Sequence, residues 1–226
     1  MKKIVAGWVI LTAVAMVPAT FGQNFADVAV AVGIDINHDF GDLCVPPMGS
    51  GSAWADMDND GDIDLYVTNR GGANWMYINE GDTTMDGLPD FTNVAGDPGF
   101  PVDDPLGAGH GAVYIDYDND GDQDLYVTTW EGNNLYENQF VPSGSLSFVD
   151  VTVTAGIGDA GRAISAAWGD YDNDGWLDVY LAKHRKCGGD EQQQDHMFRN
   201  MGDGTFTDVT DELCPGAAPC DVVMGL

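Results

Sequence analysis

The sequence predicts an all-β protein: a β-propeller with about three and a half blades present, in an incomplete ring. One observation is a nine-residue acidic segment that occurs three times, beginning at Asp56, Asp116 and Asp170. The other is that each copy is flanked by short runs rich in Val, Tyr, Trp and Thr and bounded by Gly, Asn and Asp, a pattern typical of strands and turns. Repeated units of this length, each with about four short strands, are typical of propeller blades.

The first 22 residues are predicted to be a secretory signal peptide. A basic start at 1–3 is followed by an almost wholly apolar run at 4–17 and by small residues that suit cleavage after Gly22. The apolar run is shorter than the ~20 residues that a membrane span needs. No later stretch is long and apolar enough to cross a membrane, so we expect an exported chain that is secreted, periplasmic or at the cell surface.

Residues 23–226 are predicted to form one repeat domain. Each unit opens with Phe-x-[Asp/Asn]-Val and continues through a small-residue strand, the acidic segment, an apolar strand and an aromatic strand that ends in Asn. The repeats are expected at about 25–90, 91–147 and 148–205, with a truncated fourth at 206–226. That last unit stops inside a blade, which predicts a longer parent protein. The expected strands are 52–55, 65–68, 75–79, 111–114, 125–128, 135–138, 166–169, 179–182 and 197–200.

The acidic segments carry Asp at positions 1, 3, 5 and 9 and Gly at position 6 in all three copies. Four carboxylates within nine residues repel one another unless a cation lies among them. Oxygen ligands in that number suit calcium, and Gly at position 6 allows the loop to turn sharply around the ion. Position 7 varies between Asp62, Asp122 and Trp176, as expected if only its backbone carbonyl binds the ion.

Three other interpretations of the acidic segments fit the sequence less well than a calcium site. A helix-loop-helix calcium site requires Glu at position 12, where this chain has Val67, Val127 and Leu181. Magnesium suits the site less well, because it keeps several waters and rarely uses a cage made only of protein ligands. An ordinary acidic turn is the simplest alternative, since Asp, Asn and Gly are common turn residues, but three copies with the same four carboxylate positions argue against it.

The net charge of the chain excludes some classes of partner. The formal net charge is −29, from 37 acidic and 8 basic residues, which argues against nucleic acid and anionic membrane as partners.

An even number of cysteines in an exported chain favours disulfide bonds, and three pairings are open. Cys214 and Cys220 flank a Pro-Gly-containing loop, which would leave Cys44 to pair with Cys187. The four are not spaced like a zinc site.

The acidic segments and their surroundings resemble FG-GAP/VCBS repeats, the calcium-loop blades found in integrin α-subunit propellers and many secreted bacterial proteins. The Phe-x-Asp-Val-Thr run that leads to Ala-Gly-Ile at 148–157 is similar to repeats of the ASPIC/UnbV and cartilage-acidic-protein group. The resemblance implies about three Ca²⁺ sites, with backbone carbonyl ligation by Asp62, Asp122 and Trp176. The side-chain ligands that it implies are Asp56, Asp58, Asp60, Asp64, Asp116, Asp118, Asp120, Asp124, Asp170, Asp172, Asp174 and Asp178.

Two functions follow from these patterns. The favoured one is a secreted, calcium-binding, non-catalytic propeller module that mediates protein or carbohydrate binding or adhesion. The alternative is the calcium-stabilised propeller of a polysaccharide-degrading hydrolase or lyase. None of His38, His110, His184 and His196 accompanies a recognisable nucleophile motif, so we expect these histidines in turns or on the surface. The tryptophans in the strands are expected to pack in the core, and the side chain of Trp176 to point outward.

Overall fold

The structure is a computed structural model of the chain, and it describes residues 26–34, 36, 50–69, 71–102, 109–130, 132–159, 163–183 and 194–213. The predicted signal peptide and all four cysteines lie outside these residues. The helices within them are single turns of four residues: α1 (Phe140–Ser143), α2 (Thr152–Ala155) and α3 (Thr210–Leu213). None of these has the length to cross a lipid bilayer.

The described strands form three antiparallel sheets of four strands each, paired in chain order within every sheet. The first sheet contains β1 (Ser52–Ala55), β2 (Asp64–Val67), β3 (Trp75–Asn79) and β4 (Phe91–Asn93). The second contains β5 (Gly109–Ile115), β6 (Asp124–Thr129), β7 (Asn134–Asn138) and β8 (Phe148–Asp150). The third contains β9 (Ala163–Gly169), β10 (Asp178–Lys183), β11 (His196–Asn200) and β12 (Phe206–Asp208).

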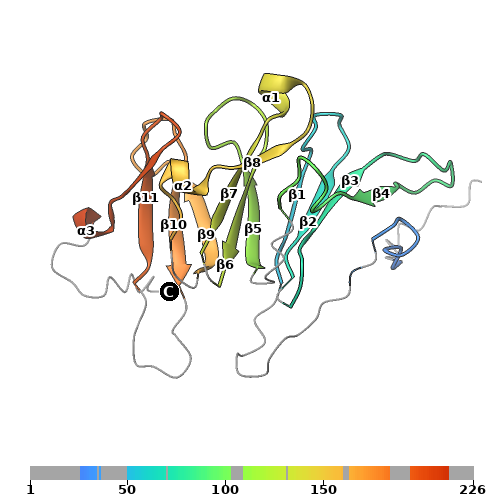
Figure 1. Cartoon of the computed structure of the whole chain (residues 1–226), viewed down its shortest axis with the longest axis horizontal. Helices are drawn as coiled ribbons and strands as arrows, with labels where there is room; N and C mark the ends of the chain where they lie inside the picture. The colour runs from blue at the N-terminus through green and yellow to red at the C-terminus, as the bar shows by residue number, and fades with distance from the viewer. Residues whose placement is uncertain are drawn as a thin grey trace, which may run out of the picture.

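The sheets stand side by side as propeller blades (Figure 1). Their first strands are neighbours, because β1 lies beside β5 and β5 lies beside β9. From this inner row the strands of each sheet succeed one another outward in chain order. The prediction of an all-β, propeller-type fold is therefore confirmed, and the three described sheets do not close a ring.

The blades are out of phase with the sequence repeats. The Phe-x-[Asp/Asn]-Val motif that opens each predicted repeat forms the outermost strand of the preceding blade: β4, β8 and β12. The start of the expected fourth unit thus completes the third blade. The first copy of the motif has no preceding described sheet to join, and the residues after it, at 29–33, form turns. Phe91 instead donates its backbone N–H to Val32 O at 2.8 Å.

In the second and third blades, the Thr that follows the four-residue motif helps to attach this outer strand. In the first blade Ala95 stands there, and Met76 N donates to Asn93 Oδ1 at 3.2 Å. Thr152 Oγ1 accepts a 2.9 Å hydrogen bond from Leu135 N in β7. Thr210 Oγ1 accepts an equivalent bond from Met197 N in β11. Each hydroxyl thus satisfies a strand N–H beyond the point where the outer strand ends, so the attachment extends past the last paired residue.

Two apolar cores fill the spaces between the blades. The core between the first and second blades includes Met57, Tyr66 and Met76 with Leu125 and Tyr136. The core between the second and third blades is built in the same way from the residues Ile115, Tyr117, Tyr126, Leu135, Ala155, Ile157, Val179, Leu181, Phe198 and Phe206. Because burial of apolar area is the main favourable term in folding, contact between blades stabilises the molecule.

Candidate metal centres in the three acidic loops

The acidic segments form the connections from β1 to β2, from β5 to β6 and from β9 to β10, and we call them the first (56–64), second (116–124) and third (170–178) acidic loops. Residue 2 of each loop points toward the next blade. Met57 is 0 % exposed and Tyr117 is 3 % exposed, since each enters the core between two blades. Tyr171, which has no fourth described blade to enter, is 39 % exposed.

The backbone of the three loops is the same. Asn at position 4 is left-handed, with φ between 56° and 60°, and Gly at position 6 has φ between 96° and 100°. The carboxylate at position 1 accepts the N–H of that glycine, at 3.0 Å from Gly61, 3.2 Å from Gly121 and 3.0 Å from Gly175. Asn tolerates the left-handed region, but the glycine conformation is strained for any residue that has a Cβ.

Replacing Gly121 with alanine is expected to destabilise the protein by about 1–2 kcal/mol through backbone strain alone. A Cβ at this position would meet no atom within 4 Å, so a steric clash does not contribute. Urea unfolding in chelator measures the effect. Gly169 is the matched control: its site is equally open and its φ lies outside the left-handed range, so Gly169→Ala should be close to neutral. Equal losses in the two variants would contradict the strain argument.

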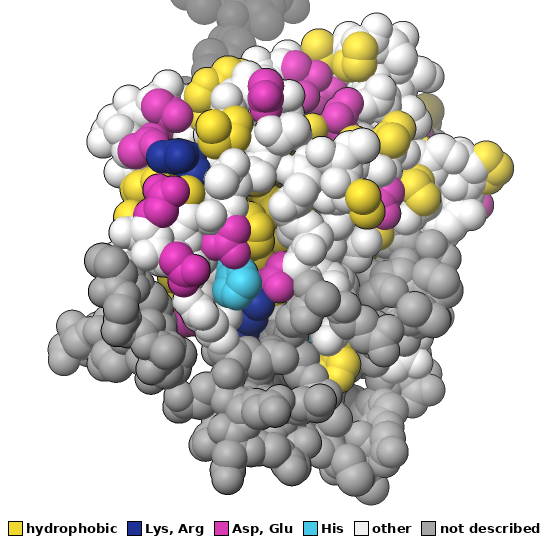
Figure 2. Space-filling view, turned by 60° about the vertical axis from the view of Figure 1, so that its left-hand side comes forward, with side chains coloured by type: hydrophobic (Ala, Val, Ile, Leu, Met, Phe, Trp, Pro, Cys, Tyr) yellow, Lys and Arg dark blue, Asp and Glu magenta, His cyan; other side chains and the backbone are white. Residues whose placement is uncertain are grey.

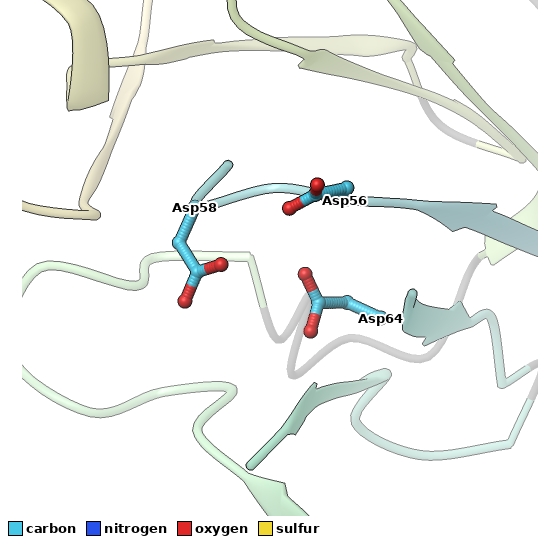
Figure 3. A group of neighbouring side chains, drawn as sticks. All are labelled: Asp56, Asp58 and Asp64. Atoms are coloured by element: carbon cyan, nitrogen blue, oxygen red, sulfur yellow. The ribbon is translucent and has the colours of Figure 1, made fainter. Parts of the chain in front are cut away.

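Carboxylates from positions 1, 3 and 9 converge in each loop. One oxygen from each of the three lies within 4.8 Å of the other two, and the arrangement is repeated in all three blades. Figure 3 shows the first cluster, in which the carboxylates of Asp56, Asp58 and Asp64 face a common space. The other clusters are Asp116 with Asp118 and Asp124, and Asp170 with Asp172 and Asp178. Each group can hold a metal ion.

The side chain at position 5 lies outside these three-residue groups. Its carboxylate accepts the N–H of position 7, at 2.8 Å for Asp60, 3.1 Å for Asp120 and 2.9 Å for Asp174. Position 5 therefore shapes the second half of the loop by a local Asx-type bond. A second oxygen of each carboxylate remains, and the assignment of position 5 as a ligand stays a prediction.

Side chains at position 7 lie against the turn that follows the third strand of the blade. Asp122 Oδ2 accepts the N–H of Val141 at 2.8 Å. Trp176 is half-buried, and a Cβ at Gly202 would lie 2.6 Å from its Nε1. The expectation of an outward-pointing Trp176 is thus wrong, because the turn after β11 passes over the indole. Carbonyl ligation by Asp62, Asp122 and Trp176 stays a prediction.

The carboxylate at position 9 is the buried anchor of each loop. Asp64 and Asp178 are 0 % exposed and Asp124 is 1 % exposed. One oxygen of each accepts the N–H of position 2, and the other accepts the N–H of the Asn that ends the third strand. For Asp124 these bonds come from Tyr117 N at 3.1 Å and Asn138 N at 2.8 Å. The same pair of bonds recurs at Asp64 and Asp178.

Burial raises the pKa of these anchors. The pKa of Asp64 rises to about 6 and that of Asp124 to about 9, chiefly because burial disfavours the charged form. Two backbone N–H bonds oppose the rise at each residue, and the carboxylates at positions 3 and 5 or 7 add to it. The pKa of Asp178 is raised for the same reason. A bound cation would favour the charged forms and offset this cost.

The residues of the second loop fit a hard cation. Asp116 Oδ1 is buried without a hydrogen-bond donor in the described part of the chain, although buried carboxylate oxygens are normally satisfied. It belongs to a group made only of carboxylates, the ligand type that calcium prefers. A cation held by Asp116, Asp118 and Asp124 would satisfy this oxygen, and it would supply charge neutralisation within the loop.

A fourth segment, which was not predicted from the sequence, has the same backbone. In residues 82–90, Asp82 accepts N–H bonds from Asp86 and Gly87 at 3.0 and 2.9 Å, as position 1 does in the acidic loops. Met85 and Gly87 have φ of 61° and 89°. Thr84 stands at position 3, and the carboxylates of this segment form no three-residue group among the described residues. The Asp-x-x-x-Asp-Gly-x-x-Asp spacing was the available signal.

The histidine and tryptophan side chains that the structure describes pack against other side chains or lie on an exposed sheet face. His110 lies in β5, is 4 % exposed, and has its Nδ1 3.1 Å from Ala163 O in the next blade. The expectation that it lies in a turn or on the surface is therefore wrong. Trp168 packs edge-on against Tyr126 and Phe206 in the core, as expected. Trp54 is 56 % exposed, contrary to the expected core position. Its face of the first sheet meets no further described blade.

Comparison with known proteins identifies the repeat. A family model described as FG-GAP-like repeat matches residues 116–181. The chain is 30 % identical to cartilage acidic protein 1 of Xenopus tropicalis over 172 residues, which cover 75 % of this chain and 24 % of that relative. It is 29 % identical to the Mus musculus and Homo sapiens proteins of the same name over 119 residues, which cover 52 % of this chain and 17 % and 16 % of those proteins.

The chain spans about a quarter or less of the length of these relatives. The family match begins at the first residue of the second acidic loop and ends within β10. The matched residues therefore include two of the three-carboxylate clusters and the strands between them. This match shows that the chain contains an FG-GAP-like repeat, and the same loop and four-stranded sheet recur in all three described blades.

Proposed function

We propose that the chain is a secreted, calcium-binding and non-catalytic repeat module that mediates binding or adhesion to a protein or carbohydrate. The observation that carries the calcium assignment is the recurrence, in three separate blades, of three carboxylate oxygens within 4.8 Å of one another. Three bound Ca²⁺ ions would neutralise charge on a chain with a formal net charge of −29. Figure 2 shows how strongly Asp and Glu predominate over Lys and Arg on one described face.

Calcium is expected to raise the stability of the protein. Extracellular calcium modules bind with dissociation constants of ~10⁻⁴ to 10⁻³ M, so three sites at about 1 mM calcium contribute roughly 1 to 4 kcal/mol by mass action. A thermal melt should therefore occur a few degrees to about ten degrees higher in calcium than in chelator. Magnesium should have much less effect. Identical melts in all three buffers would leave the loops as ordinary acidic turns.

The ligand role of position 5 has its own test. Asp120→Ala should lower the melting temperature in calcium and hardly change it in chelator, because Asp120 is exposed and makes one local bond. Asp86→Ala is the matched control, since Asp86 accepts the same bond from Leu88 N in a segment whose carboxylates form no three-residue group among the described residues. It should change both melts equally little. Equal losses for Asp120→Ala in the two buffers would remove Asp120 from the ligand set.

The binding role is favoured over the enzyme alternative because the recurring carboxylates have a common structural explanation in the loops. A panel of acidic and neutral glycans tests both. Retention of a glycan or protein ligand without turnover supports the binding module. Cleavage of a polysaccharide by the purified protein, abolished by a substitution outside the acidic loops, would establish the hydrolase or lyase instead.

Export is supported by the basic and apolar pattern of residues 1–22. When the full chain is expressed with an export pathway, the mature protein should begin at Gln23. Mass spectrometry of the protein recovered outside the cell checks this start. Recovery of the intact chain from the cytoplasm alone would contradict the proposed location.

A further inference from the structure

Asn138 and Asn200 each bond to two acidic loops in different blades. Asn138 ends β7, and its backbone N–H donates to Asp124 of the second loop at 2.8 Å. Its side-chain Nδ2 donates to Met57 O of the first loop at 2.9 Å. Asn200, at the end of β11, repeats the arrangement one blade further along. One side chain therefore spans each contact between neighbouring blades.

The bonds made by Asn200 match those of Asn138 to within 0.1 Å. Its backbone N–H donates to Asp178 of the third loop at 2.8 Å, and its Nδ2 donates to Tyr117 O of the second loop at 2.8 Å. Tyr117 and Met57 both occupy position 2, and the N–H of each is held by the position 9 carboxylate of its own loop. The two asparagines therefore join the three anchors into one continuous chain of hydrogen bonds.

This chain of bonds is buried along its whole length. Asn138 is 0 % exposed and Asn200 is 1 % exposed, like the anchors and the position 2 residues they contact. Hydrogen bonds in a low-dielectric interior are strong, and breaking one leaves a buried group without a partner. A shift in one anchor therefore strains the neighbouring asparagine rather than being absorbed by water.

We propose that the cation sites of adjacent blades are coupled through Asn138 and Asn200, so that filling one loop strengthens binding at the next. The proposal rests on the calcium function proposed above. An ion in the second loop fixes Asp124 and with it the backbone of Asn138. The side chain of Asn138 then holds Met57, whose N–H is bonded to the Asp64 anchor of the first loop.

The sign of the coupling is positive because the cost of ordering is shared. The first ion orders its own anchor and the asparagine attached to it. An ion that binds the neighbouring loop then meets a position 2 residue that is already held, and it loses less conformational entropy on binding. Asn138 and Asn200 act as positioning residues: they contact loop backbone, and no cation ligand is assigned to their side chains.

The chain contains a matched control in Asn79, which ends β3. Its backbone N–H donates to Asp64 at 2.8 Å, and its Nδ2 donates to Ile63 O at 3.2 Å within its own blade. Asn138 makes the corresponding bond to Gln123 O at 3.1 Å. Among the described residues, the difference is that Asn79 has no bond to a neighbouring blade. Asn79→Ala and Asn138→Ala each remove the same local bond, but only Asn138→Ala also removes a bond between blades.

Isothermal titration of the full chain with calcium measures the coupling. Asp172→Ala disables the third loop and leaves the first and second as a pair. Adding Asp118→Ala then isolates the first loop. We expect the first loop to bind calcium about fivefold or more tightly when the second is filled than when it is disabled, a typical magnitude for coupled sites. Asn138→Ala should abolish this ratio, and Asn79→Ala should preserve it.

Each other outcome is decisive. Equal calcium affinity of the first loop with the second filled or disabled would overturn the coupling while leaving the calcium function intact. A ratio that persists in Asn138→Ala would assign the coupling to other contacts and overturn the proposal. Absence of calcium binding in the unsubstituted chain would instead refute the proposed function itself. If Asn138→Ala does not fold, Asn200→Ala supplies the test on the second and third loops, with Asp58→Ala disabling the first.

Discussion

Replacing Asp124 with alanine is expected to lower the free energy of unfolding by about 2–5 kcal/mol even without calcium. Asp124 is 1 % exposed and accepts the backbone N–H groups of Tyr117 and Asn138. The substitution leaves both donors buried and unpaired, and each such donor costs about 1–3 kcal/mol. Urea unfolding in chelator measures the loss.

The control for Asp124 is Asp120 in the same loop, which is exposed. Asp120→Ala should cost no more than about 0.5 kcal/mol in chelator. In calcium both variants should lose additional stability, because both residues belong to the proposed ligand set. If Asp124→Ala is as mild as Asp120→Ala in chelator, the buried anchor contributes nothing to the apo fold, and its role is limited to metal binding.

Stability without calcium is expected to fall as pH rises from about 5 to about 8, and calcium should reverse this trend. The folded pKa values of Asp64 and Asp124 are about 6 and about 9, above the ordinary 3.8. Between 3.8 and its own folded pKa, each group binds a proton in the folded state and not in the unfolded state. The free energy of unfolding therefore decreases with pH, by up to about 1.4 kcal/mol per pH unit for each proton.

The trend stops above the folded pKa of each group, so Asp64 contributes up to about pH 6 and Asp124 up to about pH 9. Bound calcium keeps the carboxylates ionised, and the stabilisation it provides should grow with pH. Unfolding in chelator and in calcium across this range gives the two slopes. Asp124→Asn, which cannot titrate, should flatten the slope in chelator. If the free energy of unfolding in chelator increased with pH, this result would contradict the raised pKa values.

The strands and the acidic loops could be predicted from sequence because their determinants are local. Short runs rich in Val, Tyr and Trp around 52–55 and 64–67 favour strands, and the Asp and Gly spacing reflects one backbone conformation. β1 was predicted at its observed bounds, Ser52–Ala55. The Phe-x-[Asp/Asn]-Val motif was assigned to the repeat that follows it, but it forms the last strand of the blade that precedes it. The sequence at 91–93 does not indicate whether these residues pair with the strand before them or the strand after them.

The features that sequence reasoning missed depend on contacts between blades. The recurring Asn at the end of the third strand was visible, but nothing local indicates that Asn138 Nδ2 reaches Met57 O, which is 81 residues away. The position 9 anchors, by contrast, are buried even without a following blade, since Asp178 is 0 % exposed although no described blade follows the third loop. The segment at 82–90 was overlooked because Thr84 replaces the carboxylate at position 3, although the backbone bonds are kept.

We propose that each of the three acidic loops holds one calcium ion. Equilibrium dialysis of the purified chain against calcium, with the bound metal counted by atomic spectroscopy, tests it most directly. Three ions should bind to the unsubstituted chain, one for each cluster of three carboxylates, and two ions should bind to Asp118→Ala. A count that is zero, or that is the same in the two proteins, would contradict the account.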